Sequence, residues 1–417
     1  MPATSSSSAQ PPSVLQQIWW SNAFVFLTVH AAACVGVYYH PLSSTPRATL
    51  ILAVVLWQAA CFSITIGYHR LYSHRSFEAG QKTRAFLAVL GTSAFQGSIK
   101  WWVLRHRLHH RYTDDPVHDP YSATRGLMWS HMGWIFFKHH YERMKTIDRE
   151  DLEQDSIVRF QHQYYAVLAL STAIVFPTLL GTLWNDAMGA LIWAGLVARI
   201  AVWHCTFLVN SLAHWDGLQP YSDENTSRVN LIVAVLTCGE GNHNYHAFPQ
   251  DFRSDPSIFA WDPSKWIILG LQRIGFARDL RQAREEDLSC ALWRMHFKTH
   301  VAPDDLITTQ KTFTADVPPM TVAEIRAYVL RVQGRCILAV DNLVVDVTEY
   351  LHDHPGGDAL LRKYSIKAKT FHEDQPDERV KELRDRTTAA FQGGINKHTL
   401  AAYDRLKELA VGCLVLY

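Results

Sequence analysis

The sequence predicts an all-α integral membrane domain with four transmembrane helices and a cytosolic histidine-rich cap, followed by a small α+β domain. Three observations lead to this fold class. Four long apolar stretches occur in two close pairs, histidine clusters lie next to them, and strand-like alternation appears only near the C-terminus. A chain of 417 residues also exceeds one ordinary hydrophobic core, so two domains are expected.

The composition excludes several other classes of protein. The formal net charge is only +1, so no strong field favours nucleic acid. The seven cysteines are scattered without a CxxC pair, which argues against a disulfide framework or a zinc knuckle and fits a reducing environment. Residues 1–16 start with MPATSSSSAQPPS, which lacks Lys and Arg, and are expected to be a disordered tail and not a signal peptide.

Four apolar stretches are long enough to cross a bilayer, which takes about 20 residues. They cover residues 22–39, 50–67, 164–183 and 187–209. The fourth contains Arg199, which is costly in lipid unless its side chain faces the protein interior. Buried helices of a soluble protein are the alternative interpretation, but two close pairs of such stretches favour membrane hairpins.

The pairing of these stretches predicts the topology. Each pair forms a hairpin, so the N-terminal tail, the long middle segment and the C-terminal half lie on one side of the membrane. Lys and Arg are frequent near the spans in the middle segment, for example in KWWVLRHRLHHR, and positive residues remain on the cytosolic side. This side is therefore predicted to be the cytosol.

Histidines gather on the predicted cytosolic side. They occur in the motifs GYHRLYSHR, RHRLHHRYTDDP, NSLAHWDG and GEGNHNYHAFP, as His69, His74, His106, His109, His110, His214, His243 and His246. Neutral imidazole is a common ligand of Fe, Zn and Cu, so the set predicts a metal site. Any one motif alone also fits a surface pair or a satisfied polar residue. A zinc protease is disfavoured because HExxH does not occur.

The histidine spacing constrains how the rings can meet. Side chains at i, i+3 and i+4 share one helix face, so His106, His109 and His110 can converge, and His243 and His246 can do the same.

His69 and His74 are five residues apart and would point apart on a regular α-helix. They therefore require a helix end, or they serve different metals. Asp114, Asp115 and Glu240 are candidates to orient the ring N–H groups of ligands from outside the site.

The boxes HxxxxH, HxxHH and HxxH, together with NSLAHWDG, GEGNHNYH and DPSKW, resemble the membrane fatty-acid desaturase family over residues 17–300. The closest likeness is to the acyl-CoA branch of the stearoyl-CoA Δ9 type. This resemblance implies two iron ions held by histidines, and O2-dependent insertion of a cis double bond into a saturated fatty acyl-CoA. Asn210 matches the asparagine that reaches one metal through water.

The same resemblance implies substrate-binding residues. Asn22, Gln96 and Trp102 match positions that line the acyl tunnel or contact CoA. Arg105 and Lys138 stand where the family contacts the CoA headgroup, and cations suit its phosphates. Lys138 is equally compatible with an anchor at the membrane interface.

The third histidine box departs from the family. The family has HxxHH at this place, whereas this chain reads HNYHAFP, with Ala247 directly after His246. The chain therefore carries eight of the nine expected histidine ligands.

The C-terminal region changes in character after a Pro-bearing linker at residues 301–319. Residues 320–412 contain CILAVDNLVVDVTEYLHDHPGG and AFQGGINKHTLAA, which resemble cytochrome b5 and imply haem b with the axial ligands His354 and His398. These histidines are 44 residues apart, beyond the usual gap. The charged insertion near residues 364–388 is expected to be a solvated loop, or intron-derived translation.

Together the resemblances imply an enzyme of unsaturated fatty acid biosynthesis in the endoplasmic reticulum membrane, with its catalytic and haem domains facing the cytosol. The implied partners are fatty acyl-CoA, O2, the lipid bilayer and an NAD(P)H-dependent cytochrome b5 reductase, because no GxGxxG motif occurs in the chain. Two alternatives are a related membrane diiron hydroxylase and a catalytically impaired membrane haem- or lipid-binding homologue that lacks the third-box histidine.

Overall fold

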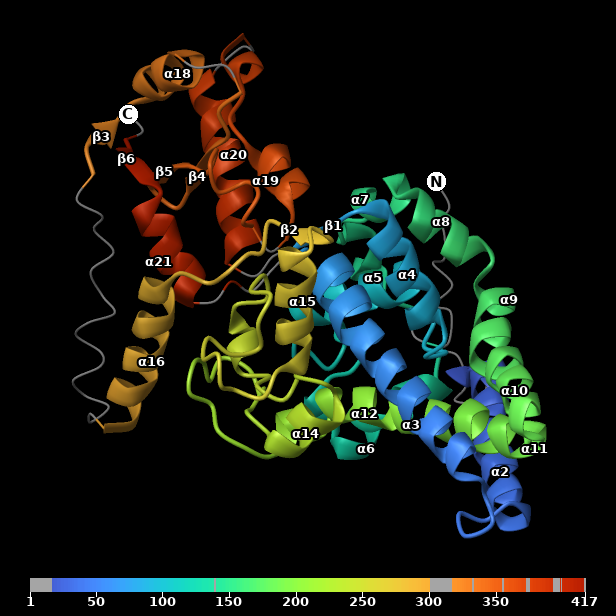
Figure 1. The fold of residues 1–417 in the computed structure, drawn as a ribbon. Coiled ribbons are helices and arrows are strands. Elements are labelled where there is room, and N and C mark those ends of the chain that lie inside the picture. The colour runs from blue at the N-terminus through green and yellow to red at the C-terminus, as the bar shows by residue number, and fades with distance from the viewer. Residues whose placement is uncertain are drawn as a thin grey trace, which may run out of the picture.

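The computed structural model describes residues 17–138, 140–300, 317–331, 334–354, 356–372, 376–392, 398 and 400–415. The predicted N-terminal tail and residues 301–316 of the predicted linker lie outside these ranges. The described chain is mostly helical, and a smaller domain with a sheet stands at one side of the helices that carry the histidine motifs (Figure 1).

Four helices are long and apolar enough to cross a membrane, and they match the four predicted stretches. They span Trp20–Tyr39, Arg47–Ser73, Tyr165–Trp184 and Ala187–Trp215. Their segments are α2 (Trp20–Tyr39), α3 (Arg47–Phe62), η1 (Ser63–Ser73), α9 (Tyr165–Leu170), η5 (Ser171–Val175), α10 (Phe176–Gly181), η6 (Thr182–Trp184), α11 (Ala187–Ala190), η7 (Leu191–Val197), α12 (Ala198–Asn210) and α13 (Leu212–Trp215). All seven cysteines lie in the described part of the chain and are free, as expected.

Polar side chains within the spans face other protein groups. Arg199 is buried, and its guanidinium donates to the carbonyl oxygens of Ser93 and Leu56, so it faces the interior as predicted. His30 of α2 contacts His204 of α12 with 3.2 Å between their Nε2 atoms. Such pairing between helices satisfies polar groups that lipid cannot.

Short helices build the cap above the spans. They are α4 (Gln81–Thr92), α5 (Ile99–Arg111), η2 (Ala123–Arg125), α6 (Leu127–His131), η3 (Gly133–Phe136), η4 (Glu142–Thr146), α7 (Glu150–Gln154), α8 (Ser156–Gln163), α14 (Leu231–Leu236), η8 (Tyr245–Ala247), α15 (Pro263–Arg273) and α16 (Glu285–His300). The strands β1 (Glu78–Ala79) and β2 (Ala277–Arg278) form an antiparallel pair. Ser98 begins α5, because its hydroxyl accepts the backbone N–H of Trp101 at the helix N-cap.

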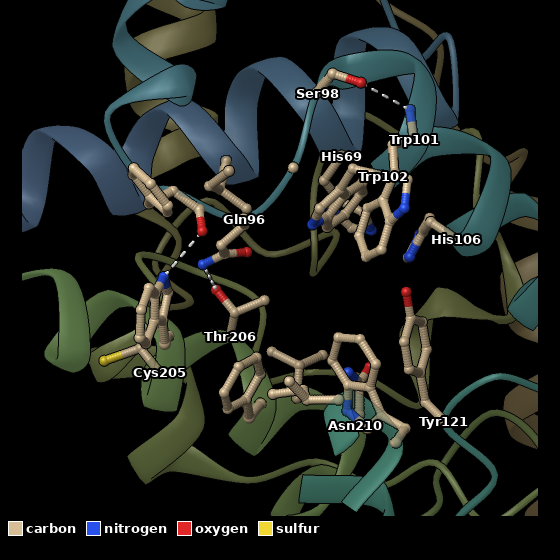
Figure 2. A pocket seen from close by; sticks show the side chains of 18 of the residues that line it. His69, Gln96, Ser98, Trp101, Trp102, His106, Tyr121, Cys205, Thr206 and Asn210 are labelled. Carbon is tan, nitrogen blue, oxygen red and sulfur yellow. Dashed lines mark hydrogen bonds between the residues drawn. The ribbon is translucent and has the colours of Figure 1, made fainter. Parts of the chain in front are cut away.

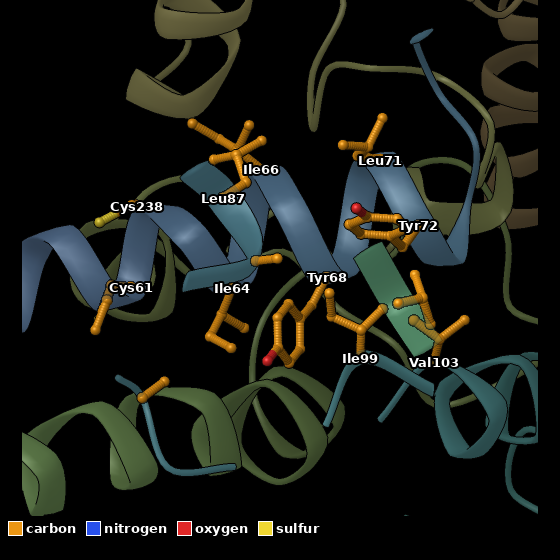
Figure 3. Close-up of a cluster of buried hydrophobic side chains, with 14 of the residues drawn as sticks. Cys61, Ile64, Ile66, Tyr68, Leu71, Tyr72, Leu87, Ile99, Val103 and Cys238 are labelled. Atoms are coloured by element: carbon orange, nitrogen blue, oxygen red, sulfur yellow. The ribbon is translucent and has the colours of Figure 1, made fainter. Parts of the chain in front are cut away.

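A buried apolar cluster fixes η1 against α4 and α5 (Figure 3). Tyr68 is fully buried among Leu87, Ile99 and Val103. Its hydroxyl also accepts a hydrogen bond of 2.8 Å from the Gln161 side chain. These contacts fix the rotation of η1 about its axis, and with it the direction of the histidine that follows Tyr68.

Arg70 is the centre of a buried ion-pair network on the opposite face of η1. Its guanidinium donates to Glu240 and Asp262 at 3.0 Å, and to the Phe252 carbonyl oxygen at 2.8 Å. Asp262 is completely buried and also caps α15 by accepting the backbone N–H of Lys265. The network thus ties the end of the second span to the loop that carries the third histidine box.

The C-terminal domain contains a four-stranded sheet in the order β3-β6-β5-β4. Its elements are β3 (Pro319–Met320), α18 (Val322–Arg331), β4 (Ile337–Val340), β5 (Leu343–Asp346), α19 (Asp358–Tyr364), η9 (Ala368–His372), α20 (Pro376–Phe391), α21 (Leu400–Glu408) and β6 (Ala410–Leu414). β3 runs parallel to β6, and the other neighbours are antiparallel. Separate apolar clusters involve alternate strand residues, which gives the domain an α+β core.

The prediction of a solvated loop near residues 364–388 is wrong. Most of this segment forms η9 and α20, and Val380 is completely buried. Val380, Leu383 and Thr387 fall at i, i+3 and i+7, so they share one helix face that packs on the domain while the charges face outward. The high charge reflects the exposed side of an amphipathic helix.

We expect the substitution Asp262→Ala to lower the free energy of unfolding by about 3–5 kcal/mol, because it leaves the buried Arg70 guanidinium without one of its partners. The matched control is Glu78→Ala, which breaks an exposed pair with Arg278 and should cost about 0–1 kcal/mol. Denaturant unfolding in detergent, followed by tryptophan fluorescence, measures both. Equal effects of the two substitutions would contradict the structural role of the network.

Candidate metal centre and adjoining cavities

Five of the predicted histidines form one cluster. The ring nitrogens of His69, His74, His106, His110 and His246 all lie within 4.8 Å of one another. The Nε2 atoms of His69 and His74 are 3.1 Å apart, and those of His74 and His106 are 2.8 Å apart. The η1, α5 and η8 segments therefore direct their rings at one small volume.

The five-residue spacing of His69 and His74 is explained by the form of η1. This segment is a π-helix, in which each backbone N–H bonds to the carbonyl five residues earlier. The backbone N–H of His74 donates to the His69 carbonyl oxygen at 3.1 Å in this way, at the helix end. The two rings therefore meet in one cluster despite their five-residue spacing.

The other three histidines form a second cluster beside the first. The ring nitrogens of His109, His214 and His243 lie within 4.8 Å of one another. The expected convergence within each box is thus only partly right. His109 turns away from its neighbour His110, and His243 and His246 also belong to different clusters, with 5.4 Å between their ring centroids.

Most of these rings are held uncharged. Removal from water lowers the pKa of His74, His106, His110 and His246 well below the ordinary value. Burial likewise lowers the pKa of His243 to about 3. Uncharged imidazole is the form that binds a metal ion.

The nitrogen contacts fit metal binding better than hydrogen bonding. The Nε2 atom of His69 lies close to two other Nε2 atoms, 3.0 Å from that of His246 and 3.1 Å from that of His74. One ring nitrogen carries at most one hydrogen, so it cannot satisfy both contacts. The buried Nε2 atoms of His110 and His214 have no hydrogen-bond partner in the described structure. Lone pairs that converge without donors are what a cation requires.

Carboxylates hold several rings from behind. Glu240 lies 3.2 Å from His69, and although burial opposes ionisation, His69 and Arg70 lower the pKa of Glu240 to about 2. Asp119, which the sequence reading missed, is buried and accepts the Nδ1–H of His109 at 2.8 Å. This carboxylate raises the pKa of His109 against the effect of burial.

The other two predicted acids have different roles. Asp114 lies 3.9 Å from His214 and accepts from the Thr226 hydroxyl, which in turn contacts His214 Nδ1 at 2.8 Å. Asp115 contacts His118 instead, outside both clusters, so its predicted role is wrong.

An apolar cavity of about 460 Å³ borders the five-histidine cluster. The predicted substrate-binding residues Asn22, Gln96 and Trp102 line it, and Asn210 lines it together with His69 and His106. In Figure 2, Trp102 stands beside these two histidines, whereas Gln96 lies toward the other side with Thr206. The Gln96 amide donates to the Thr206 hydroxyl at 2.8 Å, a partner that has no recognisable sequence motif.

The two predicted headgroup contacts do not line this cavity. The Arg105 guanidinium stacks 3.8 Å above the ring of Trp101, and that ring does line the cavity. Lys138 is exposed, and its backbone N–H donates to the Gln17 carbonyl oxygen at 2.7 Å. Arg105 therefore stands next to the cavity and Lys138 stands at the surface.

A second cavity opens in the C-terminal domain between His354 and His398. Their ring centroids are 6.5 Å apart with an interplanar angle of 24°. Each Nδ1 atom donates to a backbone carbonyl oxygen at 2.8 Å, that of Gly357 for His354 and that of Phe391 for His398. Burial lowers the pKa of His354 to about 4, so this ring is uncharged near neutral pH.

The rest of this second cavity links the two parts of the chain. Apolar side chains, among them Leu338, Val345, Leu351 and Leu406, line it within the C-terminal domain. On the opposite side it is lined by His74, His110 and His246 of the five-histidine cluster. The two groups of histidines therefore border one continuous space.

Comparison with known proteins gives a consistent picture. The family model described as fatty acid desaturase matches residues 47–250. Acyl-CoA desaturase 1 of Saccharomyces cerevisiae is 35% identical over 96% of this chain and 74% of its own length. The probable acyl-CoA desaturase of Schizosaccharomyces pombe is 34% identical over 96% of this chain and 79% of its own length. Acyl-CoA Delta-9 desaturase of Acheta domesticus is 38% identical over 64% of this chain and 76% of its own length.

We expect the substitution Asp119→Asn to weaken metal binding at the three-histidine cluster by about 10–100-fold, because His109 loses the carboxylate that fixes its orientation. The matched control is Asp115→Asn in the same loop, whose partner His118 lies outside the clusters. Titration with Fe²⁺ under anaerobic conditions, followed by metal analysis, measures the affinity. An unchanged affinity in Asp119→Asn would show that His109 is not a ligand.

Proposed function

Because this chain belongs to the fatty acid desaturase family, we propose that it is an acyl-CoA desaturase that introduces a cis double bond at the Δ9 position of saturated fatty acyl-CoA. The observation that carries this proposal is the pair of adjoining, largely buried histidine clusters, one of which borders an apolar cavity through His69 and His106. The reaction consumes O2, two electrons and two protons, and it yields a monounsaturated acyl-CoA and two water molecules.

The donor set suits two iron ions. The five-histidine cluster would hold one, and the three-histidine cluster, with Asn210 acting through water, would hold the other. Bound iron supplies the activation of O2 that removes two hydrogens from unactivated carbons. Imidazole-only coordination contrasts with the carboxylate sites of soluble helix bundles.

The remaining residues bind and orient the acyl chain. The apolar walls around Trp102 and Phe207 exclude water and favour a saturated chain by burying its methylene groups. The Gln96 amide and the Thr206 hydroxyl form a hydrogen bond with each other. This bond lowers the cost of burying these polar groups beside an apolar ligand. Arg105 stands where a guanidinium could bind a phosphate of CoA, and Lys138 serves either the same group or the membrane interface.

We further propose that residues 320–412 form a cytochrome b5-like domain that binds haem b through His354 and His398. The ring separation and the two Nδ1 hydrogen bonds support this assignment, because they leave the Nε2 lone pairs for an iron between the rings. A Cβ atom at Gly356 would lie 2.9 Å from the His354 ring, so the loop needs glycine there. Alignments with the two fungal relatives cover 96% of the chain and therefore extend into this domain.

An electron would then reach the haem from an NAD(P)H-dependent cytochrome b5 reductase. We place the protein in the endoplasmic reticulum membrane with both domains facing the cytosol, where such a reductase meets acyl-CoA. The four apolar helices and the basic residues next to them support this orientation.

The ninth histidine that the family would supply is expected to belong to the three-histidine cluster. His246, which precedes the missing position, lies in the cluster that already has five rings. The missing histidine therefore weakens iron binding at the three-histidine cluster and leaves the five-histidine cluster complete.

Expression in a strain auxotrophic for unsaturated fatty acids tests the reaction. We expect monounsaturated chains with the double bond at Δ9, detected by mass spectrometry of the cell lipids. Insertion of His between His246 and Ala247 should raise iron binding at the weaker site by about tenfold or more, and should raise product yield. Insertion of Ala at the same place is the control for the change in loop length.

The products also separate the alternatives. Hydroxylated chains would indicate a hydroxylase. A lack of product from both the natural chain and the His insertion would indicate a non-catalytic haem- or lipid-binding protein. A lack of iron in both would refute the assignment of the clusters.

The haem assignment has its own test. We expect His354→Ala and His398→Ala to abolish the absorbance of six-coordinate haem, and Gly356→Ala to weaken haem binding because the added methyl group displaces the His354 ring. His352→Ala is the matched control, since this exposed neighbour offers only its backbone oxygen to Arg281. Normal haem absorbance in either axial variant would contradict the assignment.

A further inference from the structure

The close approach of Gly357 to the Asp148–Arg75 ion pair joins the two histidine centres. We infer that it is the route by which the C-terminal domain delivers electrons to the five-histidine cluster, an inference that rests on the proposed function. The argument starts at His354, whose Nδ1 atom donates to the carbonyl oxygen of Gly357 at 2.8 Å. The backbone of Gly357 is therefore bonded directly to a proposed haem ligand.

Gly357 also touches the membrane-anchored domain. Its φ is +81°, and a Cβ atom added there would lie 2.5 Å from an Asp148 carboxylate oxygen and 3.3 Å from Arg75 Nη1. A side chain at this position would therefore displace the Asp148 carboxylate and would strain the backbone. Because glycine has no side chain, the backbone of the haem loop can approach the surface of the first domain closely.

Arg75 completes the connection because it directly follows His74 in the chain. Its guanidinium is fixed by Asp148 at 2.8 Å and by Asp151 at 2.9 Å. Arg107 fixes Asp151 in turn and donates to the Asp148 carbonyl oxygen. The His354–Gly357 hydrogen bond, the close approach of Gly357 to the Asp148–Arg75 ion pair and a short stretch of backbone thus join a proposed haem ligand to a proposed iron ligand.

A second set of contacts holds the domains in this position. Arg281 donates to the His352 carbonyl oxygen at 2.8 Å, and its own backbone N–H donates to Ser76, two residues after His74. Arg284 pairs with Glu408 at 2.9 Å, and Arg294 pairs with Asp404. In these contacts the arginines belong to the first domain and their acceptors to the second. A basic surface of the first domain therefore faces oxygen acceptors of the second.

The continuous cavity shows that the two centres also face each other. His354 and His398 border it on one side, and His74, His110 and His246 border it on the other. In each step along this route one electron leaves ferrous haem, which becomes ferric, and reduces one ferric iron of the cluster to ferrous. The reductase restores the ferrous haem, and two such steps supply the two electrons of one desaturation.

The test measures electron transfer separately from desaturation. The purified full chain is loaded with iron and haem, the haem is reduced, and the protein is mixed with O2 and stearoyl-CoA in a stopped-flow instrument. Loss of the ferrous haem absorbance gives the rate constant of internal transfer. This rate constant is measured only on molecules that hold haem, so partial loading of a variant does not distort it.

Two variants interrupt the contact from opposite sides. Gly357→Ala adds a methyl group against Asp148, and Asp148→Lys removes the acid that fixes Arg75 and places a longer cation against the loop. We expect each to slow haem oxidation by about tenfold, the size of effect typical of a lost interface charge contact. Reduction of the haem by the reductase and the iron content should stay unchanged in Asp148→Lys, which leaves the haem loop itself intact. Glu153→Lys is the control, because this exposed acid pairs with Lys100, which belongs to the same domain.

The outcomes separate the inference from the proposed function. Natural protein that binds neither haem nor iron would refute the proposed function. Natural protein that binds both, with variants that oxidise haem at the natural rate, would refute the electron route and leave the function intact. Equal slowing by the Glu153→Lys control would show a general effect of charge, and would also refute the route.

Discussion

Neutral imidazole rings whose lone pairs converge on one volume repel each other, and this constraint governs the cap of the molecule. Burial removes the protons that would charge the rings, so support must come from their surroundings. Arg70 secures η1 to the loop of the third box through Glu240 and Asp262, and Asp119 orients His109 from behind. The ion pairs therefore hold in place a set of ligands that has little cohesion of its own.

The same elements shape the apolar cavity. The second span contributes Cys61 and Ile64 to the cavity wall and then His69 to its end. In α5, Trp102 stacks on His106, with ring centroids 4.9 Å apart, so one helix face serves both the wall and the metal cluster. Under the proposed function, a movement of either helix would shift the acyl chain and the metal ligands together, which would keep the reacting carbons at a constant distance from the metals.

Sequence patterns predicted the spans and the eight histidines because hydropathy and residue type are local properties. They could not predict the division into five and three rings, since this depends on how α5 and η8 are rotated against η1. Asp119 was missed because its role comes from a loop that folds back on His109, ten residues away. The helix α20 was mistaken for a loop because charge on an exposed helix face resembles the charge of a solvated segment.

The π-helical form of η1 makes the count of residues between His69 and His74 critical. A π-helix has one residue more per hydrogen-bonded turn than an α-helix, so deletion of one residue would let the segment relax to α-helical pitch. Every side chain beyond the deletion would then rotate, which would carry Arg75 away from the loop of Gly357 as well as His74 away from its cluster. The loop around η8 has no continuous helical rotation that fixes the direction of later side chains. It can therefore lose one residue and with it a single ligand. Insertions and deletions should thus be far rarer in η1 than in the third box among proteins that keep this chemistry.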